Sequence, residues 1–282
     1  MFILNDTIIT QRTPPDRRPS SGHRFYRSRN ALSNDSIRWQ TCPEIPDDIP
    51  FWDDMINISA RAGAQAARQT LKPASFVWAI MACVASLYYL VPASQHFFAA
   101  LTRLQTQMGL FFPFLGMGLS VGLLAESVKV GLSKEKRWTK DNTLNAAFNL
   151  LIFGVLGIFQ NYFYLLQTHL FGSGTSWHVL VPKVLFDQFI WTVFFANPYQ
   201  TILYLWKNHG FSLKKVTAQM RPFKPFWGKK ILPVLITNWA FWIPMVSIIY
   251  CFPANLQLPL AILAVTIWVL LLSILTAKAH EN

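Results

Sequence analysis

Long apolar blocks separated by short polar segments dominate the chain after about residue 75. Six blocks approach or exceed the roughly 20 mostly apolar residues that a helix needs to cross a bilayer. They cover residues 76–101, 109–130, 144–166, 181–206, 231–252 and 256–277. Lipid cannot satisfy backbone polar groups, so these blocks are expected to be helices rather than strands. The pattern predicts an all-α integral membrane protein with a bundle of about six transmembrane helices.

The chain before the first block has a different character. Residues 1–50 are rich in Pro, Ser and Arg and have little apolar periodicity, which predicts a disordered basic tail. Residues 51–73 form a weakly amphipathic pattern that begins with Phe51 and Trp52. This pattern predicts a helix lying in the membrane interface and leading into the first span. The predicted transmembrane domain is then 74–279.

Composition excludes a soluble domain. Hydrophobic residues make up 52% of the chain and charged residues only 13%, whereas soluble domains carry about 25% charged residues. The three cysteines argue against a disulfide framework, since two of them lie inside apolar blocks. The six histidines show no metal-ligand spacing, and no phosphate-binding loop or nucleophile elbow appears. The sequence therefore predicts no enzyme, no metal and no cofactor.

The net charge of +12 predicts both a partner and an orientation. The basic residues lie between apolar blocks, which favours a lipid bilayer with an anionic inner leaflet over nucleic acid as the partner. With six spans, 23 of the 25 Lys and Arg residues fall on one side, and only Arg103 and Lys183 fall on the other. Positive charge marks the cytoplasmic or matrix side, so both termini are predicted there.

The fourth block holds the main candidate site. Lys183 and Asp187 are spaced i, i+4 and share one helix face, with Gln188 beside them. An ionisable residue inside a span is by default a hypothesis of function. Two interpretations stay open: the three residues line or gate a pore, or Lys183 and Asp187 form a structural ion pair that orders the start of the helix.

The second and third blocks carry further candidates. Glu126 and Lys129, spaced i, i+3, predict a helix-end ion pair or a charged vestibule. Glycines spaced for close helix packing occur in both blocks. They are Gly118, Gly122, Gly154 and Gly157.

Several motifs follow one another in the later blocks. They comprise Gly154, Gly157, Phe163 and Tyr164; then Lys183, Asp187 and Gln188; then Thr237, Asn238, Trp239, Trp242 and Pro244; and finally Pro253, Trp268 and Ser273. In order and spacing they resemble the Mpv-seventeen/peroxisomal membrane protein family of small organellar membrane proteins, over residues 109–276. The resemblance implies a pore for small solutes in a peroxisomal, mitochondrial inner or bacterial inner membrane. Two positions differ from the family pattern: Ile158 stands where the family has a proline, and Gln257 stands where it has an arginine.

Two functions follow as hypotheses. The first is a channel-like protein for small-solute permeation, and the resemblance is the source of the pore. The alternative is a non-transporting scaffold or homeostasis protein that binds partners through its basic inner face, and the missing polar positions favour it. A homo-oligomer is compatible with either. A continuous polar stripe converging on Asp187 would favour permeation, and an apolar surface all round would favour the scaffold.

The charge count generates a topology prediction. In a cysteine-free background, we expect Ser173→Cys and Asn255→Cys to react with an impermeant thiol reagent from outside. Lys136→Cys and Lys224→Cys should react only from inside, because basic loops stay on the inner side. Accessibility of labelling in intact and permeabilised vesicles is the measurement. Labelling of positions 136 and 173 from the same side would contradict six spans.

Overall fold

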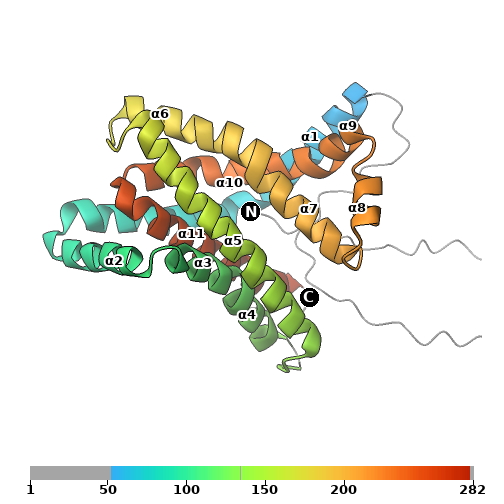
Figure 1. Ribbon diagram of the computed structural model, residues 1–282, viewed down its shortest axis with the longest axis horizontal. Coiled ribbons are helices and arrows are strands. Elements are labelled where there is room, and N and C mark those ends of the chain that lie inside the picture. Colours follow the sequence, from blue (N-terminus) through green and yellow to red (C-terminus); the bar gives the residue numbers. More distant parts are fainter. Residues whose placement is uncertain (1–51, 134, 280–282) are drawn as a thin grey trace, which may run out of the picture.

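The structure is a computed structural model that describes residues 52–133 and 135–279, and these ranges fold into helices joined by short turns. The predicted basic tail, 1–50, lies outside the described residues. The helical elements, drawn in Figure 1, are α1 (Trp52–Leu90), η1 (Pro92–Ser94), α2 (Gln95–Met108), α3 (Phe111–Gly118), η2 (Leu119–Leu124), α4 (Ala125–Leu132), α5 (Lys140–Phe171), α6 (Trp177–Phe186), η3 (Asp187–Ala196), α7 (Asn197–Asn208), α8 (Leu213–Gln219), α9 (Phe223–Phe226), η4 (Trp227–Ile231), α10 (Leu232–Tyr250) and α11 (Ala254–Ala279). Of the short elements, η1 is a 3₁₀-helix, and η2, η3 and η4 are π-helices.

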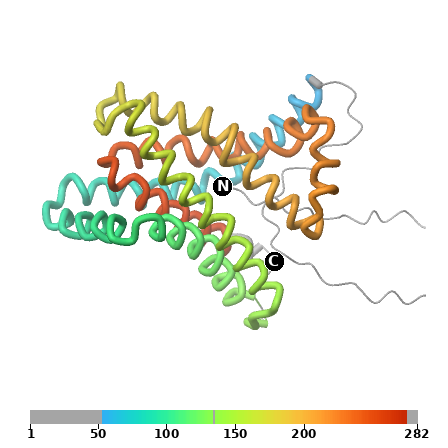
Figure 2. Tube along the Cα trace, viewed as in Figure 1, coloured from blue at the N-terminus to red at the C-terminus, as the bar shows by residue number. Residues whose placement is uncertain are grey.

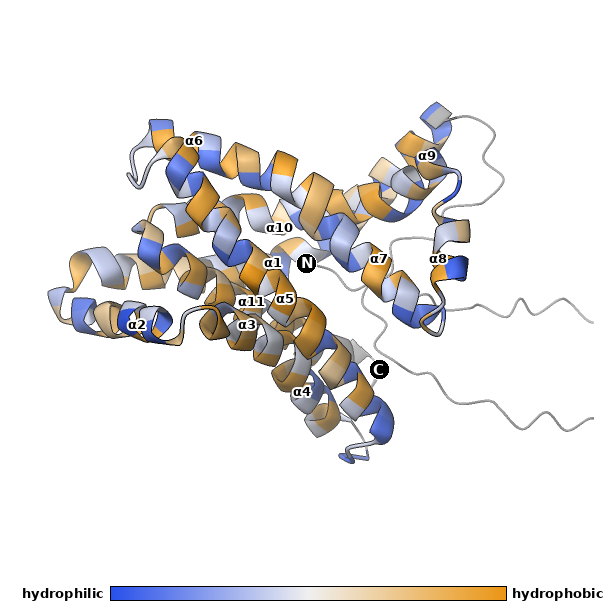
Figure 3. Cartoon of the chain, in the orientation of Figure 1, coloured by the Kyte–Doolittle hydropathy of each residue, from blue (hydrophilic) through white to orange (hydrophobic). Residues whose placement is uncertain are grey.

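Six helical units in the described ranges are long and apolar enough to cross a membrane, as the sequence predicted. They are α1, α3–η2–α4, α5, α6–η3–α7, α9–η4–α10 and α11. Apolar residues line the middle of these helices, whereas polar residues gather at several helix ends and on α8 (Figure 3). With six spans, the start of α1 and the end of α11 lie at the same end of the bundle (Figure 2).

The start of the transmembrane domain differs from the prediction. The expected interfacial helix 51–73 and the first half of the expected span 76–101 form one continuous helix, α1, which passes through Pro73. The N-terminal half of α1 is held by a stripe of small buried side chains that packs against α10. They include Ser59, Ala62, Ala66, Thr70 and Ala74. Gly63 lies against this neighbour so closely that an added Cβ would come 2.8 Å from the carbonyl oxygen of Pro233.

The first span ends earlier than predicted, at Leu90. Val91 precedes a proline and adopts an extended conformation, with φ −117° and ψ 96°. A residue before proline disfavours the helical conformation, so the helix stops there. Residues 95–108 form the separate amphipathic helix α2, and its buried Phe98 packs edge-on against Tyr88 of α1.

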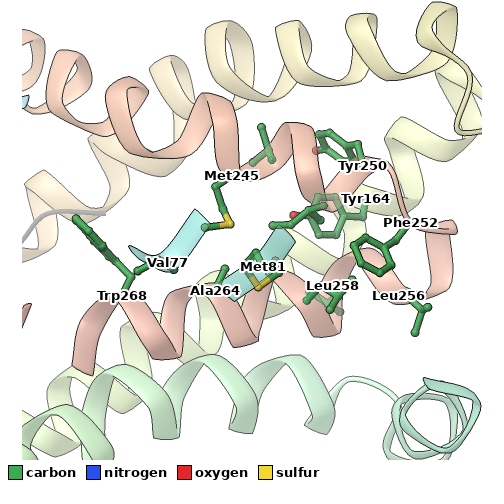
Figure 4. Packing of buried hydrophobic residues seen from close by; sticks show 14 of the residues in the cluster. Val77, Met81, Tyr164, Met245, Tyr250, Phe252, Leu256, Leu258, Ala264 and Trp268 are labelled. Carbon is green, nitrogen blue, oxygen red and sulfur yellow. The ribbon is translucent and has the colours of Figure 1, made fainter. Parts of the chain in front are cut away.

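The largest apolar core lies between α1, α10 and α11. Val77 and Met81 from α1 meet Met245 from α10 and Ala264 from α11, and all four are fully buried (Figure 4). Toward the other end of α11, Trp268 stacks on the ring of Phe241, with 4.0 Å between centroids. This core holds the fifth and sixth spans against the first.

Glycines bring the second and third spans into backbone contact, as their spacing predicted. A Cβ added at Gly118 would lie 2.7 Å from the carbonyl oxygen of Leu150, and one added at Gly122 would lie 2.7 Å from that of Ala146. One added at Gly154 would lie 2.6 Å from the Phe114 ring. In a membrane, where apolar side chains gain little by leaving lipid, such close approach is a main source of helix association.

Gly157 offers the sharpest test of this contact. A Cβ there would lie 2.3 Å from the carbonyl oxygen of Pro113, so the two helices would have to separate. We expect Gly157→Ala to lower the free energy of unfolding by about 1–3 kcal/mol, the usual cost of overpacking. The control is Gly131→Ala, because nothing lies within 4 Å of a Cβ at Gly131. Thermal unfolding in detergent is the measurement, and equal melting temperatures for the two variants would contradict the close contact.

Candidate functional site

The carboxylate of Asp187 lies inside the bundle at the start of the π-helical part of the fourth span. Only 4% of the residue is exposed. The Tyr250 hydroxyl, from the end of α10, donates to Oδ2 at 2.5 Å, and the Gln188 side-chain amide donates to Oδ1 at 3.0 Å. The Thr192 hydroxyl also interacts with this carboxylate. Asp187 is therefore held by side chains from two spans.

Lys183 does not form the ion pair with Asp187 that the i, i+4 spacing suggested. Its residue is 1% exposed, and its Nζ has no hydrogen-bond partner among the described residues. Asp187 instead accepts hydrogen bonds from Tyr250 and Gln188, which stabilise the carboxylate without Lys183. Gln167 on α5 instead contacts the backbone at this point, where its Nε2 donates to the Lys183 carbonyl at 3.2 Å.

The middle of the fourth span is a ten-residue π-helix, η3, between two α-helical parts. It ends two residues before Pro198, the second residue of α7. Proline has no backbone N–H and cannot donate to the carbonyl four residues earlier, which disturbs the regular helix before it. π-helical turns are rare and occur often at functional sites. This one carries Asp187, Gln188 and Thr192.

A cavity of about 70 Å³ lies between the third, fourth, fifth and sixth spans and the start of the second. The fourth span contributes most of its polar lining: Asp187, Gln188, Thr192, Asn197 and Gln200. Further polar side chains come from α5, with Gln160 and Tyr164, and from α10, with Asn238. A water molecule needs about 10–15 Å³ of such cavity volume, so the cavity has room for roughly five waters. Half of the sixteen lining residues are thus polar, although apolar helices surround them.

Several cavity-lining atoms have unused hydrogen-bonding capacity. Gln188 Oε1, Gln200 Oε1 and Asn197 Nδ2 are buried and have no partner in the described part of the protein. An unsatisfied buried polar atom costs about 1–3 kcal/mol. Two acceptors and one donor without protein partners therefore favour a hydrated cavity, or one that holds a polar solute.

Aromatic side chains hold the cavity wall in place. Trp239 Nε1 donates to the Gln188 carbonyl at 2.8 Å, and Trp191 Nε1 donates to Gln160 Oε1 at 3.0 Å. Tyr164 and Tyr250 meet edge-on, with 5.8 Å between ring centroids. Both are labelled beside Phe252 in Figure 4, one from α5 and one from the end of α10.

The polar face of the fourth span continues past the cavity toward the end of α7. Thr201 and Tyr204 are buried, and the Tyr204 hydroxyl donates to Asn149 Oδ1 at 2.8 Å. Near this end, Lys129 Nζ lies 3.4 Å from Glu126 Oε1, so the expected ion pair is present. Asn142 donates to the same carboxylate oxygen at 2.6 Å. Buried polar residues therefore extend from Lys183 to Tyr204 along one span.

The residues of the sequence motifs fall into two groups. Tyr164, Asn238 and Trp242 line the cavity, and Trp239 supports it through Gln188. Pro253, in the turn between α10 and α11, and Trp268, in the core, lie outside the cavity lining. Comparison with protein-family models, with curated proteins and with solved structures finds no match for this chain. Function is therefore argued from the site itself.

Other chemistry has little to support it in the described residues. They contain no group of three His, Cys, Asp or Glu side chains that could hold a metal ion. Cys83 and Cys251 are free thiols. The polar cavity is therefore the candidate site in the described residues.

Sequence reasoning missed several residues of the site. Gln200 lies three residues after Asn197, and Tyr204 lies four residues after Gln200. This spacing places all three side chains on one face of a helix, and it is visible in the sequence. Tyr250 gave no such signal. It lies 63 residues from Asp187 in the chain, and only the packing of α10 against α6 brings the two together.

Because Lys183 has no ion-pair partner among the described residues and Lys129 has one, removing the two ammonium groups should change the free energy of unfolding in opposite directions. We expect Lys183→Met to raise the free energy of unfolding by about 1 kcal/mol or more, since it removes a buried, unpartnered ammonium group. The control, Lys129→Met, should lower it by about 0.2–1 kcal/mol, because Glu126 loses its partly exposed ion pair but keeps the hydrogen bond from Asn142. Thermal unfolding in detergent measures both. A lower stability of Lys183→Met would mean that Lys183 does have a stabilising partner.

Proposed function

We propose that this chain is a channel-like protein through which small polar solutes cross a membrane, with the cavity beside Asp187 as a station on the path. One observation carries the proposal: the buried polar face of the fourth span, which extends from Lys183 to Tyr204 and lines a polar cavity in its middle. A solute leaving water needs substitute hydrogen bonds, and polar pore linings supply them. The proposal assigns no catalytic step to the chain.

The energetics of the lining favour permeation over a scaffold. A scaffold needs only apolar packing between its spans, and each unsatisfied amide in its interior would lower its stability with no return. Here Gln188, Asn197 and Gln200 all retain unpartnered atoms at one cavity. This loss of stability is expected where polar side chains form hydrogen bonds with a passing solute instead of with other side chains of the protein.

The resemblance to the Mpv-seventeen/peroxisomal membrane protein family supports the same proposal. Tyr164, Asp187, Gln188, Asn238 and Trp242 come from three separate motifs, and all line one cavity. We propose a bacterial inner, mitochondrial inner or peroxisomal membrane as the site of action, with both termini on the cytoplasmic or matrix side. The charge distribution supports this orientation.

Single-channel recording in planar bilayers tests the function. We expect the purified protein to conduct, and Asp187→Asn to change the ion preference, because a hydrated carboxylate acts on ions that pass it. Gln200→Leu should lower conductance by replacing an amide of the cavity wall with an apolar side chain. The matched control is Gln107→Leu on the exposed surface of α2, which should conduct as the unaltered protein does.

The outcomes separate the two hypotheses. Folded protein that gives no current above protein-free bilayers would overturn permeation and leave the scaffold. Conduction with equal properties in Asp187→Asn, Gln200→Leu and the control would place the path outside this cavity.

A further inference from the structure

After the fourth span the chain folds into a short arm, residues 211–226, which contains α8 and also α9, the first turn of the fifth helical unit. It lies beyond the end of α7, at one end of the bundle (Figure 1). Two buried side chains, Val216 and Phe226, hold it there in one apolar cluster with Leu205 and Leu235. The arm is therefore a fixed surface at the place where two spans leave the bilayer.

This arm carries charge of one sign. Lys214, Lys215, Arg221 and Lys224 are exposed on it, and none has an ion-pair partner among the described residues. No Asp or Glu occurs in the sequence from residue 188 to residue 280. The arm thus has no acidic residue of its own, and its four cations are exposed to an external anion.

Exposed apolar side chains accompany these cations. Phe211 is 53% exposed, Leu213 68% and Phe223 64%. At the base of the arm, Trp206 packs edge-on against Phe211, and its buried indole N–H has no hydrogen-bond partner in the described part of the protein. Water alone is a poor environment for the three exposed apolar side chains, whereas the boundary between lipid headgroups and acyl chains suits them.

We propose that the arm binds anionic phospholipids of the leaflet that this end of the bundle meets. The four cations contact headgroup phosphates, and Phe211, Leu213 and Phe223 enter the upper acyl region. The position of the arm favours lipid over nucleic acid or an acidic protein as the ligand. The helix α7 ends at Asn208 and α10 begins at Leu232, so the arm between them lies at the level of the lipid headgroups. A nucleic acid or an acidic protein would match the cations but would leave the apolar side chains unused. This inference does not depend on the permeation proposal.

Lipid titration of the full-length protein tests the site. The test variant combines Lys214→Gln, Lys215→Gln and Lys224→Gln. The matched control combines Lys136→Gln, Arg137→Gln and Lys140→Gln, which removes three exposed cations from a loop that also holds Glu135 and Asp141. The probe is dioleoyl phosphatidylglycerol, with dioleoyl phosphatidylcholine as the neutral reference, and binding to protein in neutral detergent is followed by native mass spectrometry.

Each basic residue near an anionic surface contributes roughly fivefold in affinity, so the test variant should lose on the order of 100-fold in phosphatidylglycerol binding. The control should lose much less, and phosphatidylcholine binding should change in neither. Melting temperature without lipid checks folding, and Lys215→Gln or Lys224→Gln alone replaces a triple variant that unfolds.

Three results would overturn the proposal. Equal losses in the test and control variants would show a general charge effect rather than a site on the arm. Competition by glycerol phosphate at the same concentration as the lipid would show that the acyl region contributes nothing. Preferential binding of a short oligonucleotide over phosphatidylglycerol would assign the surface to another polyanion.

Discussion

The absence of water in a bilayer constrains everything in the middle of this protein. A carboxylate in that setting must receive its hydrogen bonds from the protein or from water that the protein encloses. Asp187 has both kinds of environment, since Tyr250 and Gln188 donate to its two oxygens and the polar cavity lies against it. The π-helix η3, the amide side chains of the cavity wall and the tryptophans that hydrogen-bond to that wall all lie around Asp187.

Close helix approach is what makes room for such an interior. Backbone contact between the second and third spans, through Gly118, Gly122 and Gly157, fixes one wall of the bundle with little side-chain volume. On the opposite side, the small residues of α1 do the same against α10. The fourth span needs no such contact along its polar face, so its amides are left to line a cavity.

The fourth span also connects the cavity to the basic arm. Val193 belongs to the π-helix that carries Asp187, and it is buried in one cluster with Val216 and Phe226 of the arm. The helix that lines the cavity and the segment that carries the exposed cations thus share a packed core.

Length and hydropathy were enough to predict six spans, because crossing a bilayer imposes a minimum apolar length that can be read directly. Small-residue spacing similarly predicted close helix packing at Gly118 and Gly122, and the structure gives α5 as the neighbour. The failures were of two kinds. An interfacial helix over 51–73 was predicted to precede the first span, yet α1 continues through Pro73 because packing against α10 outweighs the loss of one backbone hydrogen bond.

The other failure concerns partners distant in sequence. The spacing of Lys183 and Asp187 satisfied the local rule for an ion pair, but a local rule cannot weigh a competing donor from another helix. Tyr250 is such a donor, and a hydrogen bond to a carboxylate is worth more than an ordinary one. With the Tyr250 hydrogen bond in place, the Asp187 carboxylate lines the cavity, and the ammonium group of Lys183 has no hydrogen-bond partner among the described residues. Sequence therefore identified Lys183, Asp187 and Gln188, whereas the donor Tyr250 and the pairing of these groups depended on how α10 packs beside the fourth span.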